Sequence, residues 1–291
     1  MKYIFVNLKR FDVPSESGGV NQLAAPDKWA EAIIPKVCAG LEKYIKDTKF
    51  QSGISFTFFF PEAHIIQSTA AKGNFPLSIG CQGVYWDDIA KGGNFGAFTS
   101  SRPAAAMAAI GCTAVIIGHC EERRALAAIL AEGGVGGDKS VAAINRLLGK
   151  EIAAAKARNL EVLYCIGEKA EEQEYWQDVL SAQIDAGLSA VPDGKFVIGY
   201  EPVWAIGPGK TPPDRTYIEK IARFIKRKAK EDYGLMDIPV VYGGGLKTDN
   251  AEMLASIPEI DGGLIALTRF SGEIGFYPEE YLEIVDLYLH K

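Results

Sequence analysis

Three ionisable residues follow short apolar runs at distant points of the sequence. Lys9 comes shortly after the first run, and His119 and Glu201 each close a later one. Together they would supply a cation, an imidazole and a carboxylate, the groups that proteins use to move protons and to stabilise negative charge. Taken singly, they are more ordinary: a solvated loop lysine, a structural histidine, and a glutamate that caps a helix or pairs with an arginine. They indicate chemistry only if the fold brings all three together.

The apolar runs before these residues alternate with longer segments of helical character. Strands are predicted at 3–7, 54–60, 76–82, 113–119, 161–167, 195–201, 238–244 and 262–267. Helices are predicted at 27–46, 101–110, 139–158, 170–188, 214–231, 249–256 and 278–289, with a weaker helical segment at 62–71. Several strands are apolar throughout, as strands buried on both faces are. This alternation predicts parallel strands joined by crossover helices.

Eight such units favour a closed (β/α)8 TIM barrel, with an open doubly wound sheet as the alternative. No repeat or linker divides the sequence, so one domain over residues 1–291 is predicted. The chain is roughly 40 residues longer than the ~250 typical of this barrel. The additional length is assigned to enlarged loops after strands 1, 3 and 4, at 11–27, 87–98 and 130–140. In a barrel these loops share the C-terminal face with the three ionisable residues, and active sites are built on that face.

The composition argues against several classes of protein. A net charge of −6 does not provide the basic face that nucleic-acid binding needs, and no apolar run is long enough for a membrane helix. The five cysteines are scattered without CxxC spacing, which predicts reduced thiols in the cytoplasm. The three histidines are far apart, so no metal site is predicted. The segment GPGKT (207–211) lacks the first glycine of a nucleotide-binding P-loop.

Five segments resemble the triosephosphate isomerase family, and they occur in the family's order. They are NLK (7–9), QGVYWDD…GAFT (82–99), GHCEERR (118–124), YEPVWAIGPGKT (200–211) and YGGGLK (242–247). The resemblance extends over nearly the whole chain. It implies a (β/α)8 barrel, usually dimeric, that interconverts a phosphorylated aldose and ketose without a cofactor.

The resemblance also implies roles for residues on the C-terminal face of the barrel. Glu201 would carry a proton between two carbons of the sugar, and His119 would donate a hydrogen bond to the enediolate oxygens. Lys9 would supply positive charge for the enediolate and the phosphate. Asn7 is expected to help position the substrate, and Glu121 to orient Lys9 and the third loop.

The segment after Glu201 is expected to form a lid over it. Residues 203–206 are apolar, and a closed apolar lid would exclude water from the carboxylate. Because desolvation raises the pKa of a carboxylate toward working pH, the lid would make Glu201 a better base. The phosphate needs backbone N–H donors that only small residues let it approach. Gly207 on the lid and Gly244–Gly245 after the seventh strand fit that need.

The sequence departs from the family at two places that bear on the site. Ala266 and Leu267 occupy the positions of the family's phosphate-binding glycines after the eighth strand. Arg269 either compensates with a bidentate grip on the phosphate or is a surface charge. The segment HCEERR also holds one acidic residue more than the family pattern, so either Glu121 or Glu122 can take the place of the family glutamate; Glu121 is favoured.

Function is predicted with two alternatives. The first prediction is isomerisation of glyceraldehyde 3-phosphate and dihydroxyacetone phosphate, a reaction of glycolysis and gluconeogenesis. The changed eighth loop and the rim insertions motivate an isomerase of a related sugar such as a tetrulose phosphate. A non-catalytic barrel that binds a phosphorylated metabolite is the third possibility, and it gives no reason to retain Lys9, His119 and Glu201 together. A homodimer is predicted, although the third loop carries extra residues around 92–93.

Overall fold

The computed structural model describes residues 1–47, 50, 53–189, 196–207 and 209–290. Eight parallel strands form a closed barrel in which each strand pairs with its neighbours in sequence order, and β8 returns to β1. The strands are β1 Lys2–Asn7, β2 Ile54–Phe60, β3 Ser78–Cys81, β4 Ala114–Ile117, β5 Glu161–Ile166, β6 Phe196–Tyr200, β7 Val240–Tyr242 and β8 Gly262–Ile265. The predicted barrel is confirmed, and the open sheet is ruled out.

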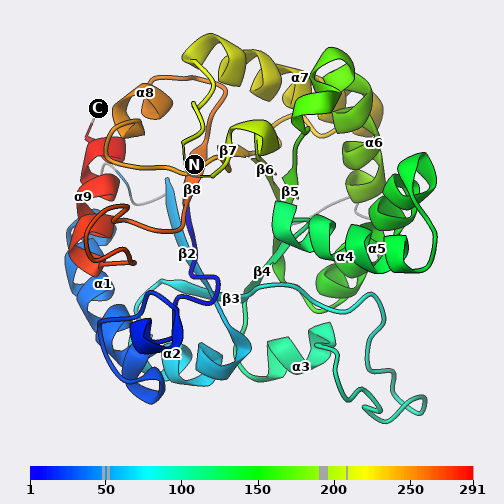
Figure 1. Cartoon of the computed structure of the whole chain (residues 1–291). Helices are drawn as coiled ribbons and strands as arrows, with labels where there is room; N and C mark the ends of the chain where they lie inside the picture. Colours follow the sequence, from blue (N-terminus) through cyan, green and yellow to red (C-terminus); the bar gives the residue numbers. More distant parts are fainter. Residues whose placement is uncertain (48–49, 51–52, 190–195, 208, 291) are drawn as a thin grey trace.

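The α-helices form a ring around the barrel (Figure 1). They are α1 Trp29–Lys46, α2 Ile65–Lys72, α3 Ala104–Ala109, α4 Cys120–Glu132, α5 Gly137–Ala157, α6 Trp176–Leu188, α7 Arg215–Tyr233, α8 Ala251–Ala255 and α9 Pro278–Leu289. In the described part of the chain, each helix is too short or too polar to cross a bilayer.

The alternation of side chains along the strands produces two apolar cores. Phe59 of β2 points into the barrel and packs with Phe5, Leu163 and the other inward residues. Phe58 and Phe60 point outward and pack under the helices. Both faces of each strand are therefore buried, which explains why the strands are apolar throughout.

The strand ends and one loop differ from the prediction. β3, β4, β7 and β8 are shorter than expected because their last predicted residues belong to the loops of the rim, and β3, β4 and β7 also begin one or two residues later than predicted. Residues 130–140 were expected to form a loop, but α4 continues to Glu132 and α5 begins at Gly137. The helix continues because residues 125–132 are alanines, leucines, isoleucines and a glutamate, most of which favour helix. The connection is the glycine-rich segment 133–136.

Two long loops leave the C-terminal face. In the first, Asp12 is buried and lies 3.1 Å from His64 Nε2, while Arg10 binds the same carboxylate at 2.8 and 3.0 Å. In the second, residues 82–103 run outward beyond the ring of helices (Figure 1). The first loop is held against the barrel, whereas the second projects from it.

Candidate active site

The end of β1 places Asn7 and Lys9 on the rim through a tight turn. Asn7 is buried, and its side-chain oxygen accepts a hydrogen bond from the Lys9 backbone N–H at 3.0 Å. Lys9 has φ of 41°, a left-handed conformation that is uncommon for a side-chain-bearing residue. Such strain persists only where surrounding contacts enforce it, and it clusters at functional sites.

Gln82 enforces that turn, and the sequence analysis did not select it. Its side-chain nitrogen donates to Lys9 O at 3.0 Å, and Asn7 Oδ1 and Phe59 O each lie at 3.3 Å. One amide from the end of β3 thus joins the ends of the first three strands. Two features of the sequence could have identified it: it is a polar residue at the end of a predicted apolar strand, and it begins the family-like segment at 82–99.

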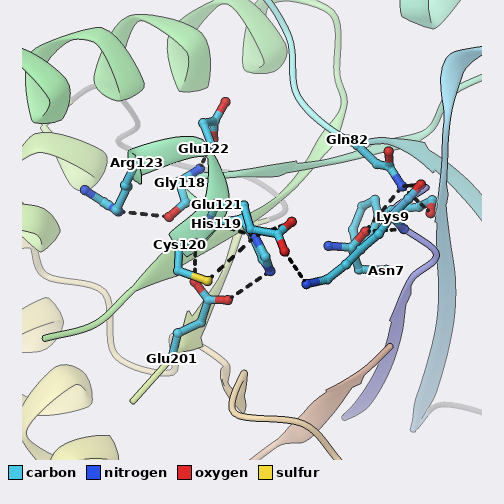
Figure 2. Close-up of polar contacts among 11 residues, drawn as sticks. Asn7, Lys9, Gln82, Gly118, His119, Cys120, Glu121, Glu122, Arg123 and Glu201 are labelled. Atoms are coloured by element: carbon cyan, nitrogen blue, oxygen red, sulfur yellow. Dashed lines mark hydrogen bonds and ion pairs between the residues drawn. The ribbon is translucent and has the colours of Figure 1, made fainter. Parts of the chain in front are cut away.

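Glu121 lies against Lys9 at the start of α4. Lys9 Nζ donates to Glu121 Oε1 at 2.7 Å, and Glu121 N–H donates to His119 Nδ1 at 3.2 Å (Figure 2). The structure therefore places Glu121, rather than Glu122, beside the lysine. His119 is the N-cap of α4, because its ring nitrogen accepts a hydrogen bond from the first turn.

His119 is an electrically neutral hydrogen-bond donor in this arrangement. Burial lowers its pKa to about 4, and the positive charge of Lys9 adds to the effect. Because Nδ1 accepts from the helix, the ring hydrogen is assigned to Nε2. Nε2 lies 3.2 Å from Glu201 Oε1. The imidazole thus stands between the carboxylate and the Lys9–Glu121 pair (Figure 2).

Glu201 follows β6 and is almost completely buried, with 2% of its surface exposed. Its Oε2 accepts a hydrogen bond from Cys120 N–H at 2.9 Å. Oε1 faces His119 but has no aligned hydrogen-bond donor among the described residues. Burial is the main cause that raises the pKa of Glu201 to about 8. A carboxyl group with a free oxygen and a pKa near neutrality is suited to general-base chemistry.

Two glycines allow the barrel wall to close around Glu201. A Cβ at Gly167, after β5, would lie 1.7 Å from the Glu201 carbonyl oxygen. A Cβ at Gly243, after β7, would lie 2.8 Å from Glu201 Cγ. Both contacts are shorter than van der Waals distance, so neither neighbour of the base leaves room for a side chain.

The predicted lid begins as a short 3-10 turn, Val203–Ala205, whose tryptophan is tied to the barrel. Trp204 Nε1 donates to Glu168 Oε1 at 2.7 Å, and the hydroxyls of Tyr200 and Tyr217 donate to the same oxygen at 2.9 and 3.0 Å. Glu168 is fully buried and was not identified from the sequence, because its three donors come from three different segments. Residue 208 of the predicted lid segment lies outside the described residues.

The expected phosphate-binding residues lie at the ends of β6, β7 and β8. Gly207 has φ of 121° and Gly245 has φ of 98°, conformations that favour glycine. Gly244 lies against the base of the lid, since a Cβ there would be 3.0 Å from Pro202 Cγ. Ala266 and Leu267 follow the last residue of β8 and are partly exposed.

Arg269, considered for a grip on the phosphate, is paired with residues of the outer ring. Its Nε donates to Glu280 Oε1 at 2.7 Å, and its guanidinium lies 3.8 Å from the centroid of the Tyr277 ring. Glu280 belongs to the first turn of α9, so this side chain turns toward a helix of the outer ring. The sequence could not reveal this pairing because the partner lies on the next element.

The second glutamate of the α4 start turns away from Lys9. Glu122 Oε2 accepts from Gly118 N–H at 2.5 Å, and its carboxyl group also hydrogen-bonds the buried carboxyl group of Glu151. Two carboxyl groups in hydrogen-bond contact must share a proton. Burial, followed by the negative charge of Glu122, raises the pKa of Glu151 to about 9. Arg123 Nε donates to Gly118 O at 2.8 Å, so both polar groups of the residue before His119 are held.

A cavity of about 390 Å³ opens beside these groups. Its lining includes Asn7, Lys9, Gln82, His119 and Glu121, and it continues toward Arg102 and Glu122. Cavities of this size bind small metabolites. The structure therefore brings four predicted site residues to one hollow, and Glu201 contacts His119 at its edge.

One set of possible metal ligands overlaps this site. Donor atoms of His119, Cys120 and Glu201 lie within 4.8 Å of one another. Burial raises the pKa of the Cys120 thiol to about 12, which disfavours the thiolate that a metal would require. These donors therefore fit proton transfer better than they fit a metal.

Comparisons with known proteins agree with this geometry. A family model described as triosephosphate isomerase matches residues 34–284. The triosephosphate isomerase of Halorhodospira halophila is 34% identical over 233 residues, which cover 77% of this chain and 82% of that protein. That of Herminiimonas arsenicoxydans is 32% identical over 212 residues, covering 70% and 77%. The crystal structure of triosephosphate isomerase from Bartonella henselae shares the fold, with a TM-score of 0.69, 24% identity, and coverage of 99% and 98%.

The sequence resemblance is thereby confirmed, since the family model covers most of the chain. Three of the five motifs that carried the resemblance, at 7–9, 82–99 and 118–124, contribute residues to the lining of one cavity. The chain belongs to the triosephosphate isomerase family.

Proposed function

We propose that the protein interconverts glyceraldehyde 3-phosphate and dihydroxyacetone phosphate without a cofactor. The observation that carries the proposal is the pairing of a buried carboxylate with a neutral imidazole. Glu201 has a pKa raised to about 8 by burial, and its free oxygen lies 3.2 Å from His119 Nε2. Family membership supports the same reaction.

The proposed reaction is a proton transfer between adjacent carbons. Glu201 removes a proton from the carbon beside the carbonyl group, and the electron pair moves to the carbonyl oxygen to form an enediolate. The hydroxyl proton of the enediolate moves to the former carbonyl oxygen, and the protonated Glu201 returns its proton to the former carbonyl carbon, which leaves the carbonyl group on the carbon that was first deprotonated. Because the base holds the proton between the two steps, the sugar is isomerised with no net gain or loss of atoms.

The enediolate would be stabilised by two groups that already face the cavity. His119 Nε2–H donates a hydrogen bond to its oxygens, and triosephosphate isomerase is itself the established example of a neutral imidazole in this role. The Lys9 ammonium, oriented by Glu121 at 2.7 Å, supplies positive charge. Asn7 and Gln82 hold the turn that carries the lysine.

The test is turnover of glyceraldehyde 3-phosphate together with solvent isotope exchange. The wild-type protein should incorporate solvent deuterium at the substrate carbon, and Glu201→Gln should abolish both exchange and turnover. Exchange that persists in Glu201→Gln would remove Glu201 from its role. Phosphate-ligand binding without any exchange in the wild type would instead establish the non-catalytic barrel.

A tetrulose phosphate is the second candidate substrate, and Ala266 and Leu267 favour it. Side chains at positions where the family has glycines change the volume offered to a phosphate and therefore the seat of the sugar. Comparing kcat/KM for glyceraldehyde 3-phosphate and for erythrulose phosphates decides between the two. Tetrulose turnover that is far faster than triose turnover would overturn the first proposal.

Assembly into a homodimer is also proposed. The projecting loop 82–103 exposes apolar side chains, including Phe95 at 87% exposed, and a partner surface would cover them. A monomeric mass in solution at micromolar concentration would contradict this. A cytoplasmic location is proposed on the five cysteines, all of which are free; fractionation of cells expressing the protein tests it.

A further inference from the structure

The phosphate-binding edge of the barrel has lost two features of its family pattern. Ala266 and Leu267 occupy positions after β8 where the family has glycines, and Gly245 occupies a position where the family has a serine. Arg269 does not replace them, because Glu280 and Tyr277 hold its guanidinium. A phosphate dianion bound here would have one side-chain hydrogen-bond donor fewer, and an ammonium group can supply such a donor.

Lys247 lies where such a group is needed. Its Cε is 3.6 Å from the position that a Cβ on Gly245 would occupy, so the side chain folds back over the loop after β7. Its Nζ lies 4.6 Å from the centroid of the Phe270 ring, which follows β8. The side chain therefore spans the gap between the two loops that flank the expected phosphate position.

The backbone around Lys247 is fixed, while its charge is not neutralised. Asn250 accepts from Lys247 N–H at 2.8 Å and donates to Gly245 O at 2.9 Å, which joins the loop to the start of α8. Within the described ranges, no carboxylate oxygen comes within 4.0 Å of Lys247 Nζ. Lys36 and Lys46 of the outer helix α1, by contrast, each pair with a nearby acidic group.

We propose that Lys247 is a substrate-binding residue that contacts the phosphate group through its ammonium. This inference rests on the proposed function for its substrate, a phosphorylated sugar. The ammonium would donate one charge-assisted hydrogen bond to the phosphate, in addition to those donated by the backbone N–H groups of Gly244 and Gly245. Phe270 would hold the ammonium in place through its ring face.

The contact makes a specific kinetic prediction. A charge-assisted hydrogen bond to the phosphate is present before and during proton transfer, so its loss should raise KM with little change in kcat. Lys247→Ala should raise KM for glyceraldehyde 3-phosphate, and the inhibition constant of inorganic phosphate, each by about tenfold. Lys247→Arg should restore most of both. With phosphate-free glyceraldehyde as substrate, Lys247→Ala should match the wild type.

Lys46→Ala is the matched control. It removes the same positive charge from the last residue of α1. That end of α1 precedes the start of β2, so Lys46 lies on the face of the barrel opposite the site. Equal KM and equal phosphate inhibition in Lys247→Ala and Lys46→Ala would overturn the assignment. A fall in turnover of glyceraldehyde as large as that of the phosphorylated substrate would also overturn it, because the defect would then be structural.

The two proposals can fail separately. If the wild type isomerises no sugar phosphate, the proposed function fails, and calorimetric titration of inorganic phosphate into wild type and Lys247→Ala still decides the role of Lys247. If the wild type isomerises the substrate and Lys247→Ala is unchanged in KM and inhibition, only the assignment of Lys247 fails.

Discussion

Burial of Glu201 should destabilise the folded protein by an amount that grows with pH, and Glu201→Gln should remove this destabilisation. The folded pKa is about 8, against an ordinary value of 4.5. The folded protein therefore holds the proton more tightly than the unfolded chain does. The stability linked to that proton is fully present below about pH 4.5 and is lost as pH rises to about 8.

The magnitude follows from the two pKa values. Between pH 5 and pH 8 the cost grows on average by about 1 kcal/mol per pH unit. It reaches about 1 kcal/mol at pH 5 and about 4 kcal/mol at pH 8. Because only 2% of the residue is exposed, solvent screening removes little of this. Glutamine cannot ionise, so the variant should gain stability over the wild type by about 3 kcal/mol between these two pH values.

Urea denaturation at pH 5, 6, 7 and 8 measures this gain. The protomer concentration must be the same throughout, because association would shift apparent stability. Glu231→Gln, at an exposed position of α7, is the control and should differ equally from the wild type at each pH. If the difference between Glu201→Gln and the wild type is also flat with pH, then the carboxylate is not desolvated as described and the argument for a tuned base fails.

Three further predictions follow from the surroundings of the site. Gln82→Ala should lower kcat/KM about tenfold by releasing the strained Lys9 turn, and a value within twofold of wild type would refute the role of Gln82. Trp204→Phe removes the hydrogen-bond donor to Glu168 and should lower kcat several-fold with a smaller change in KM. Stopped-flow measurement should show a changed rate of product release, and an unaltered kcat would count against a tethered lid. Glu151→Gln keeps a hydrogen-bond donor for Glu122 but removes a carboxyl group whose pKa is raised to about 9. The melting temperature of the variant should therefore exceed that of the wild type by a margin that grows from pH 5 to pH 9. A constant or shrinking margin would contradict the shared proton.

The barrel could be predicted from the sequence because its signal is local. Runs such as residues 54–60 are apolar at every position, and strands covered by helices outside and by a packed core inside require that pattern. The order of strands and helices then limits the topology. Part of the rim was predictable for the same reason, since Lys9, His119 and Glu201 are ionisable groups that follow buried strands.

The contacts made across the rim could not be predicted in this way. Nothing in the segment around Gln82 shows that its amide reaches the ends of two other strands, and Glu168 gains its three donors only after the chain has folded. Arg269 illustrates the converse case. Its residue type and position suited phosphate binding, but in the structure its guanidinium pairs with Glu280 on the following helix. Pairings between distant elements are set by packing, which periodicity and motifs do not encode.

The two glycines beside Glu201, Gly167 and Gly243, let the barrel wall pack directly against this residue. With the chain of residue 167 against its carbonyl group and the chain of residue 243 against its Cγ, retreat into the wall is sterically closed. On its other side, the carboxylate lies 3.2 Å from the ring of His119, which lines the hollow that would receive the sugar. A side chain at residue 243 would push the side chain of Glu201, and one at residue 167 would push its backbone, so moving this group by either route requires rebuilding the ends of the strands.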